Sequence, residues 1–159
     1  MTNSTAEIST IQMEIDIDAS TDKVWQALVS NIGEWWPAEF YTGGDADSRR
    51  FTIEATPGGR MFEEWGDGGG TLWGTVIALD PGKKLQIIGY LFPDWGGPTQ
   101  NYGTWTLDEN GGKTRMTFSE TGLGRVTEEG LKEKDHGWRF VWETLKAHVE
   151  GKPKPVWAD

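Results

Sequence analysis

The stretch HGWRFVWETLKAHV, residues 136–149, is the long segment of this chain with clear helical periodicity. At about 100° per residue, its large apolar side chains fall on one stripe, together with a leucine one turn or two earlier. The stripe contains Leu131, Trp138, Val141, Trp142, Leu145 and Val149. Charged residues such as Arg139 and Glu143 project to another side. A helix with two tryptophans on its buried face needs a broad apolar surface, and a curved antiparallel sheet would supply it.

The residues before this helix alternate in the manner of β-strands. A first, half-buried strand is predicted from strict alternation at Ile11, Met13, Ile15 and Ile17. Later strands are separated by the turn signals Pro57-Gly58-Gly59, Pro81-Gly82 and Asn110-Gly111. Short turns join antiparallel neighbours, so we expect a meander of about six strands after the first.

Two short helices are expected between the first strand and the rest of the sheet. Residues 19–22 end the strand and offer an N-cap for a helix over residues 24–28. A second helical piece runs from Ile32 to Trp36 and ends at Pro37. The predicted fold is therefore α+β, with a curved antiparallel sheet wrapped around a long C-terminal helix and two short helices after the first strand.

Length and charge favour one acidic domain. The chain has 159 residues, so we expect a single domain over residues 8–150, with loose termini at 1–7 and 151–159. Its formal net charge of −10 repels phosphate backbones, which argues against nucleic-acid binding. The sequence shows neither a run of ~18 apolar residues nor a secretory signal, so we expect a cytoplasmic protein without membrane insertion.

Metal and cofactor sites are not predicted. The chain has no cysteine, and ~18 Å of helix axis would separate His136 from His148, too far to share one ion. The glycine run over residues 66–70 matches neither a dinucleotide fingerprint nor a phosphate loop. We therefore expect no metal and no cofactor.

Several short motifs, spread over residues 10–150 in a characteristic order, carry a family resemblance. They are residues 19–28, Trp35-Trp36, residues 57–60, residues 74–76, Asp80-Pro81, residues 112–118, and His136-Gly137-Trp138 with Leu145. In this pattern the chain resembles the START-like or birch-pollen-allergen-like (SRPBCC) superfamily, which has the helix-grip fold. Within it, the chain looks most like the branch related to the activator of the heat-shock-protein-ninety ATPase.

The resemblance implies a protein with a cavity between sheet and helix. Members of the superfamily bind lipids, polyketides, steroids or hormones there, and a few catalyse cyclisation. The branch offers no catalytic motif that transfers residue by residue, so catalytic residues stay unknown. Whether the chain is an enzyme remains open, with a non-catalytic role favoured.

Strand alternation predicts which side chains face the helix. The inward residues on three neighbouring strands are Met116, Phe118 and Glu120, then Gly103, Trp105 and Leu107, then Leu85, Ile87 and Gly89. The inward glycines leave space for a cavity, or they relieve strain in a bent sheet; both interpretations stay open at this stage.

Two glutamates are candidate polar groups of the cavity. Glu120 follows Phe118 in phase, and Glu64 is in phase with Phe62. A partly desolvated carboxylate is suited to proton transfer or to anchoring a donor group of a ligand. The alternative is that both glutamates lie solvated at strand ends, and their spacing does not show whether they meet.

The predicted cavity is aromatic and largely apolar, and its expected function is to bind a hydrophobic or aromatic small molecule. Its residues are Trp105, Phe118, Ile87, Trp138, Val141, Trp142 and Trp35, with Glu120 or Glu64 as the polar anchor. Such walls suit a flat apolar ligand that carries a donor or cationic group.

Two other functions stay open. The cavity would serve an enzyme of the polyketide cyclase or hydrolase type, with a carboxylate as acid and base. Alternatively, the chain is a protein-interaction module, such as a chaperone partner or a homodimer, with an exposed patch around Trp36, Trp95 or Trp157.

Overall fold

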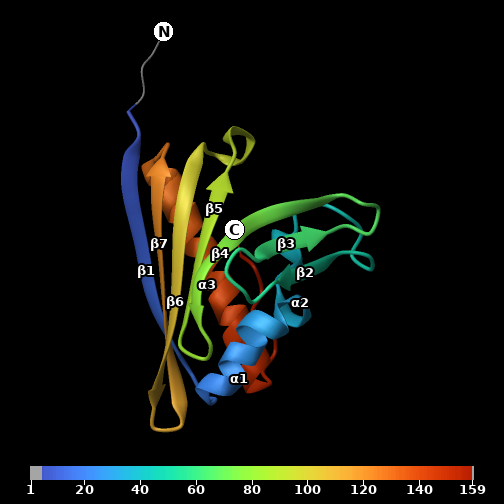
Figure 1. Cartoon of the computed structure of the whole chain (residues 1–159), viewed down its shortest axis with the longest axis vertical. Coiled ribbons are helices and arrows are strands. Elements are labelled where there is room, and N and C mark those ends of the chain that lie inside the picture. Colours follow the sequence, from blue (N-terminus) through green and yellow to red (C-terminus); the bar gives the residue numbers. More distant parts are fainter. Residues whose placement is uncertain (1–4, 159) are drawn as a thin grey trace.

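The computed structural model describes residues 5–158 and has one curved sheet that holds a long helix (Figure 1). Seven antiparallel strands form this sheet in the order β1-β7-β6-β5-β4-β3-β2. The long helix α3 (Glu128–Glu150) packs on one face of it, and short helices follow the first strand. The predicted α+β fold of the helix-grip type is confirmed.

The strands follow the predicted hairpins, although several are longer than their sequence patterns. Their bounds are β1 (Glu7–Ile17), β2 (Arg50–Ile53), β3 (Arg60–Glu64), β4 (Gly70–Asp80), β5 (Lys84–Leu91), β6 (Thr99–Asn110) and β7 (Lys113–Gly124). Consecutive strands from β2 to β7 pair antiparallel, whereas β1 pairs with β7. Gly111 and Gly112, with φ of 62° and 82°, make the tight turn between the two longest strands.

The short helical segments lie between β1 and β2. They are α1 (Thr21–Trp25), the π-helical η1 (Gln26–Ser30), α2 (Ile32–Trp35) and the 3₁₀ turn η2 (Ala38–Phe40). A further 3₁₀ turn, η3 (Pro93–Trp95), lies in the loop between β5 and β6. The predicted cap at the start of α1 is Ser20, whose hydroxyl accepts a hydrogen bond from the amide of Lys23 at 3.2 Å.

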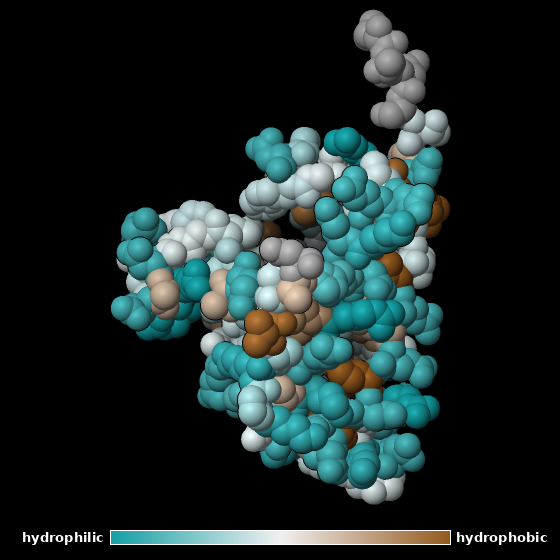
Figure 2. Space-filling view, turned by 180° about the vertical axis from the view of Figure 1, so that it is seen from behind, coloured by the Kyte–Doolittle hydropathy of each residue, from teal (hydrophilic) through white to brown (hydrophobic). Residues whose placement is uncertain are grey.

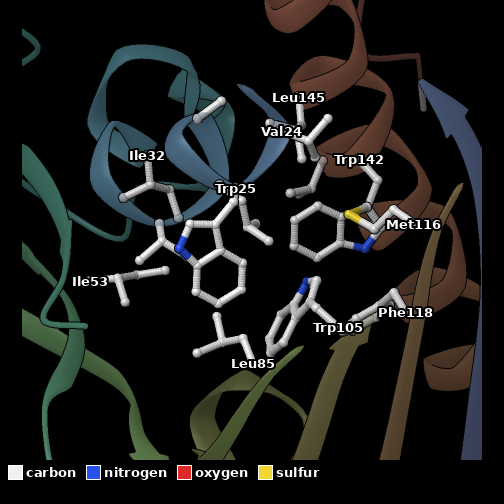
Figure 3. Packing of buried hydrophobic residues seen from close by; sticks show 14 of the residues in the cluster. Val24, Trp25, Ile32, Ile53, Leu85, Trp105, Met116, Phe118, Trp142 and Leu145 are labelled. Carbon is white, nitrogen blue, oxygen red and sulfur yellow. The ribbon is translucent and has the colours of Figure 1, made fainter. Parts of the chain in front are cut away.

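The core lies where α1, η1 and α2 are inserted between the sheet and the second half of α3. Figure 3 shows Val24 and Trp25 of α1 facing Trp142 and Leu145 of α3 across this space. Leu145 and Val24 have no exposed surface, and Trp142 is 1% exposed. This end of the molecule is packed throughout with apolar side chains.

The C-terminal tail differs from the loose segment expected over residues 151–159. Gly151 adopts a left-handed conformation with φ of 68°, which ends α3 and reverses the chain. The ring of Trp157 then packs against Phe40 and Phe140, at centroid distances of 5.3 and 5.0 Å. The tail therefore returns along α3. Residue 159, like residues 1–4 of the predicted N-terminal loose segment, lies outside the described residues.

Candidate functional site

A cavity of about 670 Å³ lies between the sheet, the first half of α3 and the loop between β5 and β6. The inserted helices fill the space at the other end of α3, and from the same insertion Trp36, at the end of α2, and Phe40 of η2 reach the cavity. The surface of the molecule is visibly hollowed beside the projecting end of the sheet that carries β2, β3 and β4 (Figure 2). Most of the lining is apolar, and much of it is aromatic: Trp36, Phe40, Trp73, Trp95, Trp105 and Trp138.

Several of the side chains expected in the cavity line it. They are Ile87 on β5, Trp105 on β6, Glu120 on β7, and Trp138 and Val141 on α3. Glycines at positions 89 and 103 lie on the same inward face and border the cavity. Strand alternation thus predicted Trp105 and Glu120 on this wall, but it did not single out Asn101 of β6, which also lines the cavity.

Three predicted aromatic residues lie behind the cavity wall instead of on it. Phe118 has no exposed surface, because the rings of Trp105, Trp138 and Trp142 cover it at centroid distances of 5.0–5.1 Å. Trp142 belongs to the same packed cluster, and the nitrogen edge of Trp105 is directed toward its ring (Figure 3). Trp35 is also fully buried, and its indole N–H donates to the carbonyl of Ala27 at 2.7 Å.

The tryptophans expected near the rim have different surroundings. Trp36, a candidate lid and a candidate surface contact, is 4% exposed and lies inside the cavity wall, stacked on Phe51. Trp95 is half exposed at the tip of the β5–β6 loop, as its Gly- and Pro-rich context predicted, and it lines the cavity from that side. Its ring contacts the exposed Phe92 edge to face.

Glu64 does not reach the cavity, and the glutamate before it is the buried one. Met61 and Glu63 are the inward residues of β3, with 3% and 1% exposure. Glu64 and Phe62 share the outer face, where the guanidinium of Arg60 covers the Phe62 ring at 4.2 Å. The assignment of Glu64 was wrong because β3 carries an apolar side chain on both faces. Glu64 and Glu120 therefore do not form an acid–base pair.

The carboxylate of Glu63 is held entirely by neutral donors. It accepts hydrogen bonds from the amide and hydroxyl of Thr42, the first at 2.8 Å, and from the indoles of Trp65 and Trp73 at 2.7 and 3.2 Å. These contacts fix the loop after η2 to β3 and β4. They also fix the orientation of Trp73, which lines the cavity. The alternation Met61, Glu63, Trp65 was the sequence signal that would have found this residue.

Glu120 lies in the cavity wall beside a lysine of α3. Its residue exposure is 7%, and its Oε1 lies 3.0 Å from the ammonium nitrogen of Lys134. The same ammonium donates to the side-chain carbonyl of Asn101 at 3.1 Å. Lys134 and Asn101 also line the cavity. The expected anchor for a donor or cationic ligand is therefore already paired with a cation of the protein.

The family of the chain follows from comparison with known proteins. A family model described as "Activator of Hsp90 ATPase homolog 1-like protein" matches residues 18–150. The chain belongs to this family. The predicted membership of the START-like superfamily is confirmed with it, since these residues include the inserted helices, six strands of the sheet and all of α3.

Solved structures share the fold of this chain at low sequence identity. An uncharacterised protein from Rhizobium leguminosarum is 18% identical, with a TM-score of 0.67 over 93% of this chain and 98% of that one. The Aha1 dimer from Colwellia psychrerythraea is 21% identical, with a TM-score of 0.63 over 89% and 96%. Ara h 8.0201 is 13% identical, with a TM-score of 0.67 over 92% and 100%. A comparison with curated protein sequences found no match.

Within residues 5–158, histidine and carboxylate side chains do not gather in groups of three or more that would hold a metal ion. None of the helices described is long and apolar enough to cross a membrane.

Proposed function

We propose that this protein binds a hydrophobic, aromatic small molecule in the cavity between the sheet and the first half of α3. The observation that carries the proposal is the cavity itself, about 670 Å³ in volume and walled by aromatic rings. Pockets that enclose small organic ligands have volumes of roughly 300–1,000 Å³ and predominantly apolar linings. Its volume and lining suit a ligand of two to four fused or linked rings.

The way the cavity wall is built supports an open cavity for a ligand more than a space filled by the protein's own side chains. Gly103 faces the cavity from the centre of β6, and a methyl group there would lie 3.0 Å from the ring of Trp105. Trp73 is held in place by Glu63 at 3.2 Å, and Trp138 stacks on Trp142 with an interplanar angle of 4°. The rings that line the cavity are thus positioned before a ligand arrives, which lowers the entropic cost of binding.

The family supports the same proposal. The chain shares its fold with Ara h 8.0201 and with the Aha1 dimer of Colwellia psychrerythraea, and superfamily members use this space between sheet and helix for apolar ligands. In our proposal the chain uses the cavity in the same way, as a carrier or sensor of its ligand.

Two measurements test this function. Native mass spectrometry of the gently purified protein is expected to show a small-molecule adduct that is lost on unfolding. Titration with N-phenyl-1-naphthylamine, a neutral aromatic probe, is expected to give saturable binding with enhanced probe emission. Gly103→Val should abolish that binding, because its Cβ would lie 3.0 Å from the ring of Trp105 and would displace that ring in the cavity wall.

A matched control is Gly58→Val, in an exposed turn where a side chain would meet no atom within 4 Å. Its φ of 84° makes it a strained substitution as well, so it reproduces a stability loss without entering the cavity. Unchanged probe binding in Gly103→Val, or an absence of saturable binding in the wild type, would contradict the proposed function.

A further inference from the structure

The polar cluster of Glu120, Lys134 and Asn101 in the cavity wall has properties that select among aromatic ligands. We infer that it recognises an uncharged ligand bearing a hydroxyl group, such as a phenol, and that it disfavours ligands with a full positive or negative charge. This inference rests on the proposed binding function and names the chemical class of its ligand.

The sheet leaves the cluster open toward the cavity. Glu120 on β7 lies directly across from Gly103 on β6, and Asn101 on β6 lies across from Gly122 on β7. On the side of the β6–β7 pairing, each polar side chain therefore has a glycine as its cross-strand neighbour, whereas on the β1 side Glu120 lies across from Ile11. Lys134 reaches the pair from α3, where its side chain is 21% exposed. All three polar side chains border the cavity.

The hydrogen bonds of the cluster leave one acceptor and one donor for a ligand. Glu120 Oε1 lies 3.0 Å from the Lys134 ammonium as an ion pair, but neither oxygen of this carboxylate has a hydrogen-bond partner among the described residues. The Lys134 ammonium has three N–H groups, and one of them donates a hydrogen bond to Asn101. A ligand hydroxyl is able to donate to Oε2 and to accept a remaining N–H of Lys134.

The charges of the cluster cancel, and this decides the charge of the ligand. A cationic group placed here would meet Lys134, and an anionic group would meet Glu120, each at short range in a site sheltered from water. Arg125, Glu129 and Glu133 also line the cavity, but they are exposed, so that solvent and salt screen them. A neutral hydroxyl satisfies both members of the buried pair without this penalty.

A series of naphthalenes that differ in one substituent tests the inference near neutral pH. The ligands are naphthalene, 2-naphthol, 2-naphthoate and the ammonium form of 2-naphthylmethylamine, measured by displacement of N-phenyl-1-naphthylamine. Hydrogen bonds to charged groups contribute enough for a roughly tenfold gain in affinity. We expect 2-naphthol to bind about tenfold tighter than naphthalene, and both charged ligands to bind more weakly than 2-naphthol.

Variants assign the preference to the cluster. Lys134→Met, which keeps the apolar stem, should remove the advantage of 2-naphthol and leave the affinity for naphthalene unchanged. Glu120→Gln leaves Lys134 without its carboxylate and should make 2-naphthoate the preferred ligand. Lys132→Met is the control, because that lysine is exposed and paired with Glu128 on the same helix, and it should behave as the wild type.

The outcomes separate this inference from the proposed function. If naphthalene binds and 2-naphthol binds no tighter, or if the advantage survives in Lys134→Met, the recognition cluster is overturned and the binding cavity stands. If the probe binds but none of the four ligands displaces it, the recognition cluster is likewise overturned; if the probe itself shows no saturable binding, the binding function is overturned. Naphthalene affinity also reports whether each variant is folded, and Glu120→Gln decides the question if Lys134→Met does not fold.

Discussion

The two halves of α3 lie against the same sheet but differ in what fills the space between helix and sheet. Along the second half, α1, η1 and α2 occupy that space, and Trp142, Leu145 and Val149 are at most 3% exposed. Along the first half the insertion contributes Trp36 and Phe40 to the wall but leaves a cavity, which Leu131, Lys134 and Trp138 border from the helix. The comparison shows that the insertion after β1 fills the space at one end of the helix and leaves a cavity at the other.

The largest difference between the two halves of α3 is expected when a leucine is removed from the second half, where the inserted helices fill the space. Leu145→Ala removes a side chain with no exposed surface, and we expect it to lower the free energy of unfolding by about 3 kcal/mol. Leu131→Ala makes the same change in the hollow half and is expected to cost less than about 1 kcal/mol. Urea denaturation followed by tryptophan fluorescence measures both values. Equal losses for the two leucines would remove the distinction between the halves.

The two buried glutamates also differ in their surroundings. Protein donors occupy both oxygens of the Glu63 carboxylate, whereas the Glu120 carboxylate faces the cavity. In Glu63→Gln an NH₂ group replaces one carboxylate oxygen and cannot accept a hydrogen bond. It would face either the indole N–H of Trp73 or the N–H of Thr42, so at least one buried hydrogen bond is lost. We expect a loss of about 2 kcal/mol in unfolding free energy, together with a changed near-ultraviolet circular dichroism spectrum. The exposed neighbour provides the control, because Glu64→Gln should change neither. If Glu63→Gln changed neither the unfolding free energy nor the spectrum, the hydrogen bonds of Glu63 would not hold the loop after η2.

The returning tail covers the flank of α3 outside the predicted stripe. Removing the ring in Trp157→Ala takes away its contacts with Phe40, Phe140 and the imidazole of His136. Because the ring is only half-buried, we expect a loss of about 1 kcal/mol, measured as a lower melting temperature. Val156→Ala changes a side chain that is 88% exposed and should leave the melting temperature unaltered. A tail that contributes nothing would give the two variants the same melting temperature.

A smaller, pH-dependent effect is expected at the end of the filled half. Burial tends to raise the pKa of Glu150, but hydrogen bonds from Lys146, Lys152 and the amide of Asp18 outweigh it and lower the pKa to about 2. A carboxyl whose pKa is lower in the folded state stabilises the fold above its ordinary value of 4.5. This contribution is lost as the pH falls toward 2.

The measurement is the difference in unfolding free energy between the wild type and Glu150→Gln at a series of pH values. We expect the difference to be constant above about pH 4.5 and to shrink as the pH is lowered. Glu143→Gln, at an exposed position on the same helix, gives the background. A difference that grows on acidification would contradict the sign of the pKa shift.

The sequence was informative wherever one face of an element is apolar and the other is polar. This holds for β6 and β7, and their alternation located Trp105 and Glu120 in the cavity wall. It fails for β3, where Met61 and Phe62 offer apolar side chains to both faces, so that the phase stayed undetermined and the wrong glutamate was chosen.

Contacts between distant parts of the chain were out of reach for a different reason. The pairing of Lys134 with Glu120 depends on how α3 is rotated on the sheet, and periodicity does not specify that rotation to within one side chain. The tail was predicted to be loose because Lys152, Pro153 and Lys154 give no structural signal. Its anchor, Trp157, finds Phe40 more than a hundred residues earlier in the chain.

The position of β1 affects how the protein is made on the ribosome. Glu7 pairs with Gly124 and Ile17 with Thr114, so the first strand to be synthesised has the last strand as its partner. Closing a loop of roughly a hundred residues is entropically costly and slow. A nascent chain that ends before β7 therefore carries β1 as an unpaired, alternating apolar strand, which is the form most open to aggregation. Co-translational folding of this protein has to wait for its final third.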